Sequence, residues 1–179
     1  MTNNSYKTVS ESTVTISELM LPSHSNFSGK IHGGYILSLL DQIAFACASK
    51  HSRAYCVTAS VDTVDFLNPI EVGELVTMRA SINYVGKSSM VVGIRVEAEN
   101  IQTGKIKHCN SSYFTMVAKN DNGKSISVPG LLLKTELEIM RFLRAIKRAE
   151  VKRIKKQDFF YDEKKHLEVL KKYNIKIEL

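Results

Sequence analysis

The stretch GYILSLLDQIAFACASK, residues 34–50, and the β-rich sequence that follows it from Tyr55 to Ala118 decide the fold. The first stretch lacks proline, is rich in Leu and Ala, and is apolar nearly all round. Such a helix has no polar face for water, so the pattern predicts a buried helix with other elements wrapped around it.

The wrapping elements are predicted from four β-rich runs, at residues 55–66, 75–85, 88–99 and 106–118. Short turn sequences separate them, which predicts hairpins and therefore an antiparallel meander. A further strand is expected over residues 8–19, and the loop LPSHSNFSGKIHGG connects it to the helix. The order predicts an α+β domain in which a single sheet curls around one helix. Because such a sheet leaves a face and two edges uncovered, we expect the protein to form a homo-oligomer.

The composition excludes several classes of protein. The chain has 179 residues, of which 44% are hydrophobic and 24% charged, as in an average globular domain. No apolar run approaches the roughly 18 residues that span a bilayer, and the N-terminus is too polar for a secretion signal. The three cysteines are expected to be reduced thiols in a cytoplasmic protein. His108 beside Cys109 cannot supply the four ligands of a zinc site, so no metal is expected.

The net charge of +7 is concentrated near the C-terminus. Residues 134–157 hold nine basic against three acidic residues, in a sequence with helical spacing of apolar residues. This segment is interpreted as an amphipathic helix packed on the core or on a sister subunit. It could also attract a polyanionic ligand, anionic membrane or nucleic acid. A second amphipathic segment is expected at residues 163–173. No DNA-binding motif is present, and neither a nucleic-acid partner nor stable membrane insertion is expected.

One acidic residue and a pair of glycines suggest chemistry. Asp41 is the only formally charged residue between Lys30 and Lys50. A carboxylate left in apolar surroundings is costly or has its pKa raised, unless it lies on a solvent or subunit-interface stripe. Gly33 and Gly34 at the helix start leave backbone N–H groups that suit an oxyanion or a phosphate. The alternative is a tight glycine loop, with the nearby asparagine as a turn former.

Together, Asn26, the run His32-Gly33-Gly34 and Asp41 resemble the signature of the hotdog-fold acyl-CoA thioesterases, in the cytosolic acyl-CoA hydrolase branch. The runs VTASVDTVDFLNPI from Val57 and YVGKSSM from Tyr84 are also similar to that family. The resemblance covers roughly residues 15–131. It implies a hotdog thioesterase domain over residues 1–131, followed by a basic helical extension over residues 132–179.

The resemblance implies a role for each matching residue. Asp41 would be the general base on water or the nucleophile, and Asn26 from the partner protomer would hold the water or the thioester. The N–H of Gly33 or Gly34 would polarise the thioester carbonyl. Lys87 stands where the family commonly has arginine, which removes a bidentate phosphate contact. The expected substrate-binding residues are His32, Thr58, Ser60, Gly86, Lys87 and Ser88.

The predicted function is hydrolysis of acyl-CoA to coenzyme A and a carboxylic acid, with coenzyme A as part of the substrate and no separate cofactor. The resemblance implies a dimer as the catalytic unit and a hexamer as the assembly. A non-catalytic acyl-CoA sensor remains the alternative. A hotdog dehydratase, which would pair His32 with a carboxylate, is a third reading. Alternatively, the His32 ring packs against loop carbonyls and has only a structural role.

Overall fold

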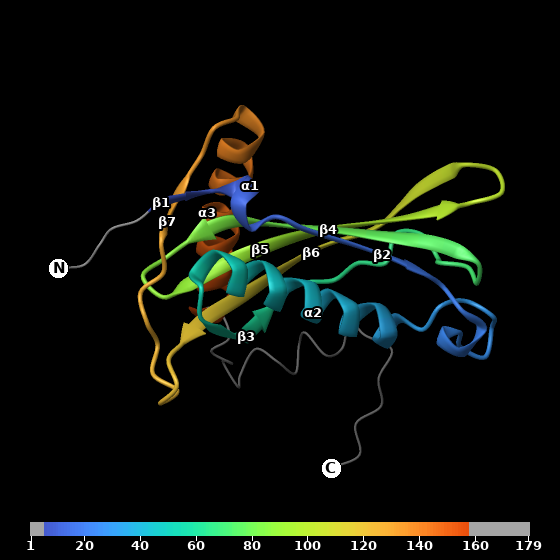
Figure 1. Cartoon of the computed structure of the whole chain (residues 1–179), viewed down its shortest axis with the longest axis horizontal. Coiled ribbons are helices and arrows are strands. Elements are labelled where there is room, and N and C mark those ends of the chain that lie inside the picture. Colours follow the sequence, from blue (N-terminus) through green and yellow to red (C-terminus); the bar gives the residue numbers. More distant parts are fainter. Residues whose placement is uncertain (1–5, 158–179) are drawn as a thin grey trace, which may run out of the picture. The chain divides into compact units, whose positions relative to one another are not determined.

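The computed structural model describes residues 6–157, with side chains to residue 153. The elements follow the predicted order, with one long helix before a meander of long strands (Figure 1). In chain order they are β1 Tyr6–Thr8, α1 Val9–Ser12, β2 Val14–Leu19, the 3-10 helix η1 Pro22–His24, α2 Gly33–Ser52, β3 Tyr55–Val61, β4 Glu74–Val85, β5 Ser89–Asn100, β6 Lys105–Lys119, β7 Gly130–Leu132 and α3 Glu136–Gln157.

Five strands form one antiparallel sheet in the order β2-β4-β5-β6-β3, and α2 packs against its concave face. This confirms the predicted α+β fold. A separate two-stranded parallel sheet joins β1 to β7. The first predicted strand is interrupted, because residues 9–12 form the single helical turn α1. The Glu11 carboxylate accepts the Thr8 N–H at 2.7 Å, and this local bond competes with strand pairing.

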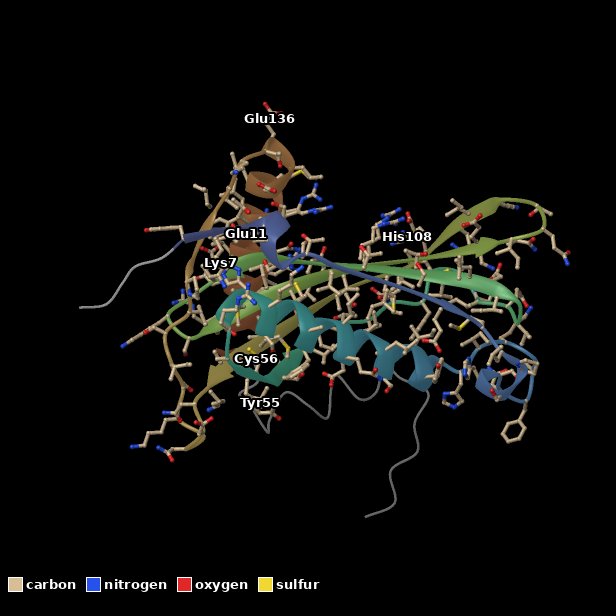
Figure 2. The ribbon with its side chains drawn as sticks, in the orientation of Figure 1. Lys7, Glu11, Tyr55, Cys56, His108 and Glu136 are labelled. Carbon is tan, nitrogen blue, oxygen red and sulfur yellow. The ribbon has the colours of Figure 1, made fainter. Side chains whose placement is uncertain are left out.

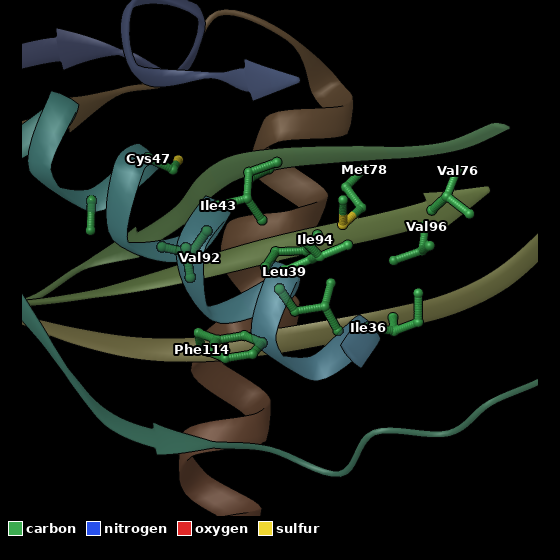
Figure 3. Packing of buried hydrophobic residues seen from close by; sticks show 14 of the residues in the cluster. Ile36, Leu39, Ile43, Cys47, Val76, Met78, Val92, Ile94, Val96 and Phe114 are labelled. Atoms are coloured by element: carbon green, nitrogen blue, oxygen red, sulfur yellow. The ribbon is translucent and has the colours of Figure 1, made fainter. Parts of the chain in front are cut away.

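The core lies between one face of α2 and the inward face of the sheet (Figure 3). Ile36, Leu40 and Ile43 from the helix are buried, as are Met78 and Val92 from the strands. Helical spacing of three and four residues and strand alternation of two residues place these side chains on facing surfaces. Burying each of them contributes about 1.5–3 kcal/mol, so this interface fixes where α2 lies on the sheet.

The opposite face of α2 is exposed within one chain, which corrects the expectation of a helix buried all round. Leu37 is 38% exposed and Phe45 is 39% exposed, and Asp41 between them is also exposed. Residues four apart share a helix face, so these three form one stripe. Two large apolar side chains beside a carboxylate indicate a face that the single chain leaves uncovered.

The chain divides into two compact units, one ending at Ala145 and the other beginning at Ile146. Helix α3 confirms the helical character predicted for residues 134–157, and in the first unit Phe142 contacts the ring of Tyr84 at a centroid distance of 5.3 Å. The amphipathic segment expected at residues 163–173 lies outside the described residues. Among the described helices, none combines the length and apolar character that a membrane span requires.

Candidate active site

Asp41 lies in the middle of α2 and is held by β3. The Thr58 hydroxyl donates a hydrogen bond of 2.6 Å to Asp41 Oδ1. The same hydroxyl lies 3.5 Å from Met116 Sδ, a longer contact to a weaker acceptor. No described residue donates a hydrogen bond to Asp41 Oδ2. One carboxylate oxygen is therefore fixed and the other is left for a ligand or water.

A β-bulge lies directly beside this contact. Thr58 pairs with Met116 and Ser60 pairs with Thr115, so Ala59 is an extra residue in β3. Thr58 lies before the bulge, on the same face of β3 as the buried Cys56 and opposite the buried Met116, so regular alternation directs it toward α2. The structure therefore brings Thr58 to Asp41. Ser60 lies beyond the bulge, and its place in the site stays a prediction.

Asn26 forms the turn that precedes α2. Its Oδ1 accepts the N–H of Ser28 at 2.9 Å, the hydroxyl of Ser28 at 2.7 Å and the N–H of Lys30 at 3.2 Å. Acceptance from two backbone donors fixes the orientation of the amide, so Nδ2 is left as a donor. The turn-forming and ligand-holding readings of Asn26 are thus compatible, because they use different atoms. An ion pair between Lys30 and Glu71, at 2.5 Å, ties the same loop to the segment before β4.

The backbone N–H groups of Gly33 and Gly34, at the start of α2, differ in whether they have an acceptor. The Gly34 N–H donates to His32 Nδ1 at 3.0 Å, whereas no described residue accepts the Gly33 N–H. The Phe66 ring lies beside Gly33, with its Cζ 3.4 Å from the position that a Cβ would take. Of the two predicted donors, Gly33 is available and Gly34 is occupied. The His32 ring is exposed and acts as the N-cap of α2.

The carboxylate and the available glycine N–H of one chain are too far apart to serve the same carbonyl group. Asp41 follows Gly33 by eight residues, which corresponds to about 12 Å along the helix axis. A reacting carbonyl must lie about 3 Å from both its nucleophile and its oxyanion donor. The Gly33 N–H and the Asp41 carboxylate of one chain therefore cannot act on the same carbonyl group.

A cluster at the start of α2 was not predicted from the sequence. The Tyr35 hydroxyl donates a hydrogen bond to Glu18 Oε1 on β2, and the Tyr35 ring stacks on His24 with centroids 4.0 Å apart. The hydrogen bond to Glu18, followed by desolvation and the carboxylate charge, raises the pKa of Tyr35 above its ordinary value. These residues lie in three separate elements, so no local spacing in the sequence indicates them.

The turn after β4 differs in part from its prediction. The Gly86 N–H is used within the turn, where it donates to the Ser89 carbonyl at 2.7 Å. The Lys87 and Ser88 carbonyls accept from Val128 and Ala118, both at 3.0 Å. The Gly86 N–H is therefore not available to a ligand, because a tight hairpin satisfies its own first donor. Lys87 is exposed, and its ammonium group remains available to an anion.

Cysteine and metal chemistry have no support among the described residues. The three cysteines are free and buried, and burial raises the pKa of the Cys47 thiol to about 12. Such a thiol is a poor nucleophile at neutral pH. The described residues contain no group of three His, Cys, Asp or Glu side chains that could hold a metal ion.

Comparison with known proteins identifies the class. Residues 28–105 match the model of the thioesterase superfamily. Protein VdlD of Helicobacter pylori is 46% identical over 145 residues, which cover 81% of this chain and 83% of that protein. The chain therefore belongs to the thioesterase superfamily, and the expected hotdog fold is confirmed.

Two further relatives have names that state an activity. YkhA of Bacillus subtilis, named as an acyl-CoA thioester hydrolase, is 37% identical over 147 residues, covering 82% of this chain and 86% of that one. An acyl-CoA hydrolase from Staphylococcus aureus, solved with butyryl coenzyme A and coenzyme A, has a TM-score of 0.79 and 32% identity. That match covers 92% of this chain and 98% of the hydrolase.

Proposed function

We propose that this protein is an acyl-CoA thioester hydrolase and that Asp41 is its catalytic carboxylate. The contact between Thr58 and Asp41 is the observation that carries the proposal. It fixes Oδ1 at 2.6 Å and leaves Oδ2 without a described partner, as a general base or nucleophile requires.

The reaction consumes one water molecule and breaks the carbon–sulfur bond of the thioester. As a general base, Asp41 takes a proton from water while the water oxygen attacks the carbonyl carbon. As a nucleophile, Asp41 forms a mixed anhydride, which water then hydrolyses. In both routes the Gly33 N–H stabilises the oxyanion, the sulfur leaves as the coenzyme A thiolate, and a carboxylic acid is released.

The active site is proposed to form between two copies of the chain. Within one copy, Gly33 and Asp41 are separated by about 12 Å along α2, so a partner must supply one of them. Asn26 precedes Gly33 by seven residues, and its Nδ2 would approach the partner's carboxylate together with the helix start. The exposed stripe of Leu37, Asp41 and Phe45 is the surface that the second copy would cover. Covering it would also place the carboxylate in the apolar surroundings expected from the sequence.

The spacing of residues studied in a relative supports these assignments. Variants of the Staphylococcus aureus hydrolase have been solved in which an asparagine, an aspartate or a threonine is replaced by alanine. Those residues are fifteen and seventeen positions apart. Asn26, Asp41 and Thr58 have the same spacing in this chain.

The assembly and location are inferred from relatives. A hexameric acyl-CoA thioesterase has a TM-score of 0.83 and 34% identity to this chain. We therefore infer a hexamer built from catalytic dimers. Relatives of 33–34% identity are named cytosolic acyl coenzyme A thioester hydrolases, which supports a cytoplasmic location. The hydrolase would occupy residues 1–131, and the basic extension from residue 132 would lie outside the catalytic machinery.

The deciding experiment measures thiol release from a panel of acyl-CoA substrates by the wild type, Asp41→Ala and Asp41→Asn. Turnover should be lost in both variants while coenzyme A binding, measured by calorimetry, stays within about threefold. Asn26→Ala should lower kcat without changing the oligomeric state. Equal turnover in the wild type and Asp41→Ala would refute the assignment of Asp41. Dissociation of Asn26→Ala would make Asn26 structural.

Single-turnover hydrolysis in oxygen-18 water tests the nucleophilic route. A general base places the label in the product acid, as does attack of water on the acyl carbonyl of a mixed anhydride. Attack of water on the Asp41 carbonyl of the anhydride leaves the label on Asp41, so a labelled Asp41 peptide, detected by mass spectrometry, establishes the nucleophilic route.

A further inference from the structure

His32 takes part in most of the hydrogen bonds made by the backbone donors at the start of α2. An α-helix begins with four N–H groups that have no partner within the helix. Here those four N–H groups belong to residues 32–35. The His32 ring accepts from Gly34 at 3.0 Å, the His32 carbonyl accepts from Tyr35 at 3.0 Å, and the His32 N–H donates to the His24 carbonyl at 2.9 Å. Of the four donors, only the Gly33 N–H has no acceptor among the described residues.

The backbone of His32 is anchored to the preceding loop. The His32 backbone N–H donates to the His24 carbonyl at 2.9 Å, and the His24 ring stacks on Tyr35, the residue that follows the glycine pair. A Cβ on Gly34 would lie 3.1 Å from His32 Nδ1, so a side chain there would press on the ring. The absence of a side chain at Gly34 thus leaves room for the His32 ring, which accepts the hydrogen bond of the Gly34 N–H.

A histidine at this position is unusual for a helix N-cap. Asp, Asn, Ser and Thr are the preferred residues, and an aspartate also interacts favourably with the helix dipole. An aspartate here, however, would place a negative charge one residue from the N–H that is proposed to bind an oxyanion. Nδ1 accepts a hydrogen bond from Gly34, so it carries no proton in this contact. The imidazole in this state caps the helix without placing an anion there.

We propose that His32 is a positioning residue that reserves the Gly33 N–H for the thioester oxyanion. It binds the competing Gly34 donor, fixes the geometry of the first turn, and keeps negative charge away from the reacting carbonyl. The inference rests on the proposed hydrolase function and assigns no contact between the His32 ring and the reacting atoms.

Three substitutions separate this role from simple helix capping. His32→Asn keeps a neutral acceptor, and kcat should stay within about threefold of the wild type. His32→Ala removes the acceptor, so kcat should fall about tenfold or more, because small displacements of catalytic groups are costly. His32→Asp keeps the cap and adds an anion, so Tm should be maintained while kcat falls about 100-fold. KM should change little in all three variants.

Thr135 provides a matched control at the start of α3. Its hydroxyl accepts the Glu138 N–H at 3.2 Å, and the Glu138 carboxylate accepts the Thr135 N–H at 3.2 Å. Thr135→Ala therefore removes an N-cap of comparable geometry. It should lower Tm by about 2–4 °C, as His32→Ala should, without affecting kcat.

The outcomes are distinguishable. If His32→Asp is as active as the wild type, or if His32→Ala lowers Tm but leaves kcat unchanged, His32 is only a helix cap and the inference is wrong. If the wild type releases no thiol from any acyl-CoA, the proposed function itself fails.

Discussion

The hydroxyl of Thr58 on β3 and Oδ1 of Asp41 on α2 are joined by a hydrogen bond of 2.6 Å, next to a bulge in β3. The two residues are 17 positions apart and lie in different elements. A carboxylate held by one oxygen keeps a defined direction while its other oxygen stays free. The pairing of Thr58 with Met116 is therefore part of the proposed catalytic geometry.

Replacing Thr58 tests this contact. Thr58→Val keeps the branched shape and removes the donor, so kcat should fall about tenfold, equivalent to about 1.4 kcal/mol. Thr58→Ser keeps the hydroxyl and should retain most of the activity. Steady-state kinetics on one acyl-CoA provides the measurement. An equal decrease of kcat in the two variants would show that the packing of the Thr58 side chain, and not its hydrogen bond to Asp41, supports activity.

Lys87 is predicted to contact phosphate groups of coenzyme A. Lys87→Ala should raise KM several-fold with little change in kcat, because the contact is remote from the reacting bond. Lys87→Arg should lower KM, since a guanidinium can bind a phosphate in a bidentate way. Both effects should weaken as salt is increased from 0.05 to about 0.5 M. A KM that is the same in all three proteins would exclude this residue from the binding site.

His51 is predicted to make stability depend on pH. It is buried near the C-terminal end of α2, with Nδ1 3.2 Å from Ser12 Oγ and Nε2 3.1 Å from the Pro129 carbonyl. The Lys7 ammonium donates to the His51 carbonyl at 2.5 Å, and Figure 2 shows Lys7 and Glu11 at this end of the sheet, opposite His108. Burial lowers the pKa of His51 below its ordinary value of 6.5, more than the hydrogen bond to Pro129 raises it.

The sign of the pH effect follows from that shift. Above pH 6.5 His51 is neutral in both states, and its contribution to stability is complete. As the pH falls below 6.5, the unfolded chain binds a proton that the folded chain resists, so the free energy of unfolding decreases. Urea unfolding at pH 7.5 and 5.5 should show a larger decrease for the wild type than for His51→Gln. Parallel pH profiles would contradict the prediction, since the other histidines are common to both proteins.

Gly93 and Asn83 form a packing pair on neighbouring strands. Asn83 is the extra residue of a bulge in β4 and is 5% exposed, and its Nδ2 lies 2.1 Å from the position of a Cβ on Gly93. Gly93→Ala should therefore destabilise the fold by about 1–3 kcal/mol through overpacking. Adding Asn83→Ala should relieve part of that loss. A double-mutant cycle by urea unfolding measures the coupling, and strict additivity would show that the amide is not the obstacle.

The elements themselves were predictable because their signals are local. The Leu- and Ala-rich run around Asp41 predicts the helix, and glycine turns such as Gly86-Lys87 divide the meander. The interruption of the first strand at Glu11 was not predicted, because one side-chain hydrogen bond to Thr8 outweighs a weak alternating pattern. The use of the Gly86 N–H within its own turn depends on backbone geometry that a glycine alone does not specify.

The sequence by itself indicated the residues that are proposed to carry the chemistry: one carboxylate in an apolar helix, two glycines at its start and an asparagine in the loop before it. Helical and strand periodicity place such residues on elements, because the physics involved spans only a few positions. Tertiary structure alone decided how they are used. It joined Thr58 on β3 to Asp41 on α2 and left the stripe from Leu37 to Phe45 exposed in the single chain. These two features depend on packing between distant segments, whereas the hydrogen bond between the Gly34 N–H and His32 spans two positions and depends on local backbone geometry.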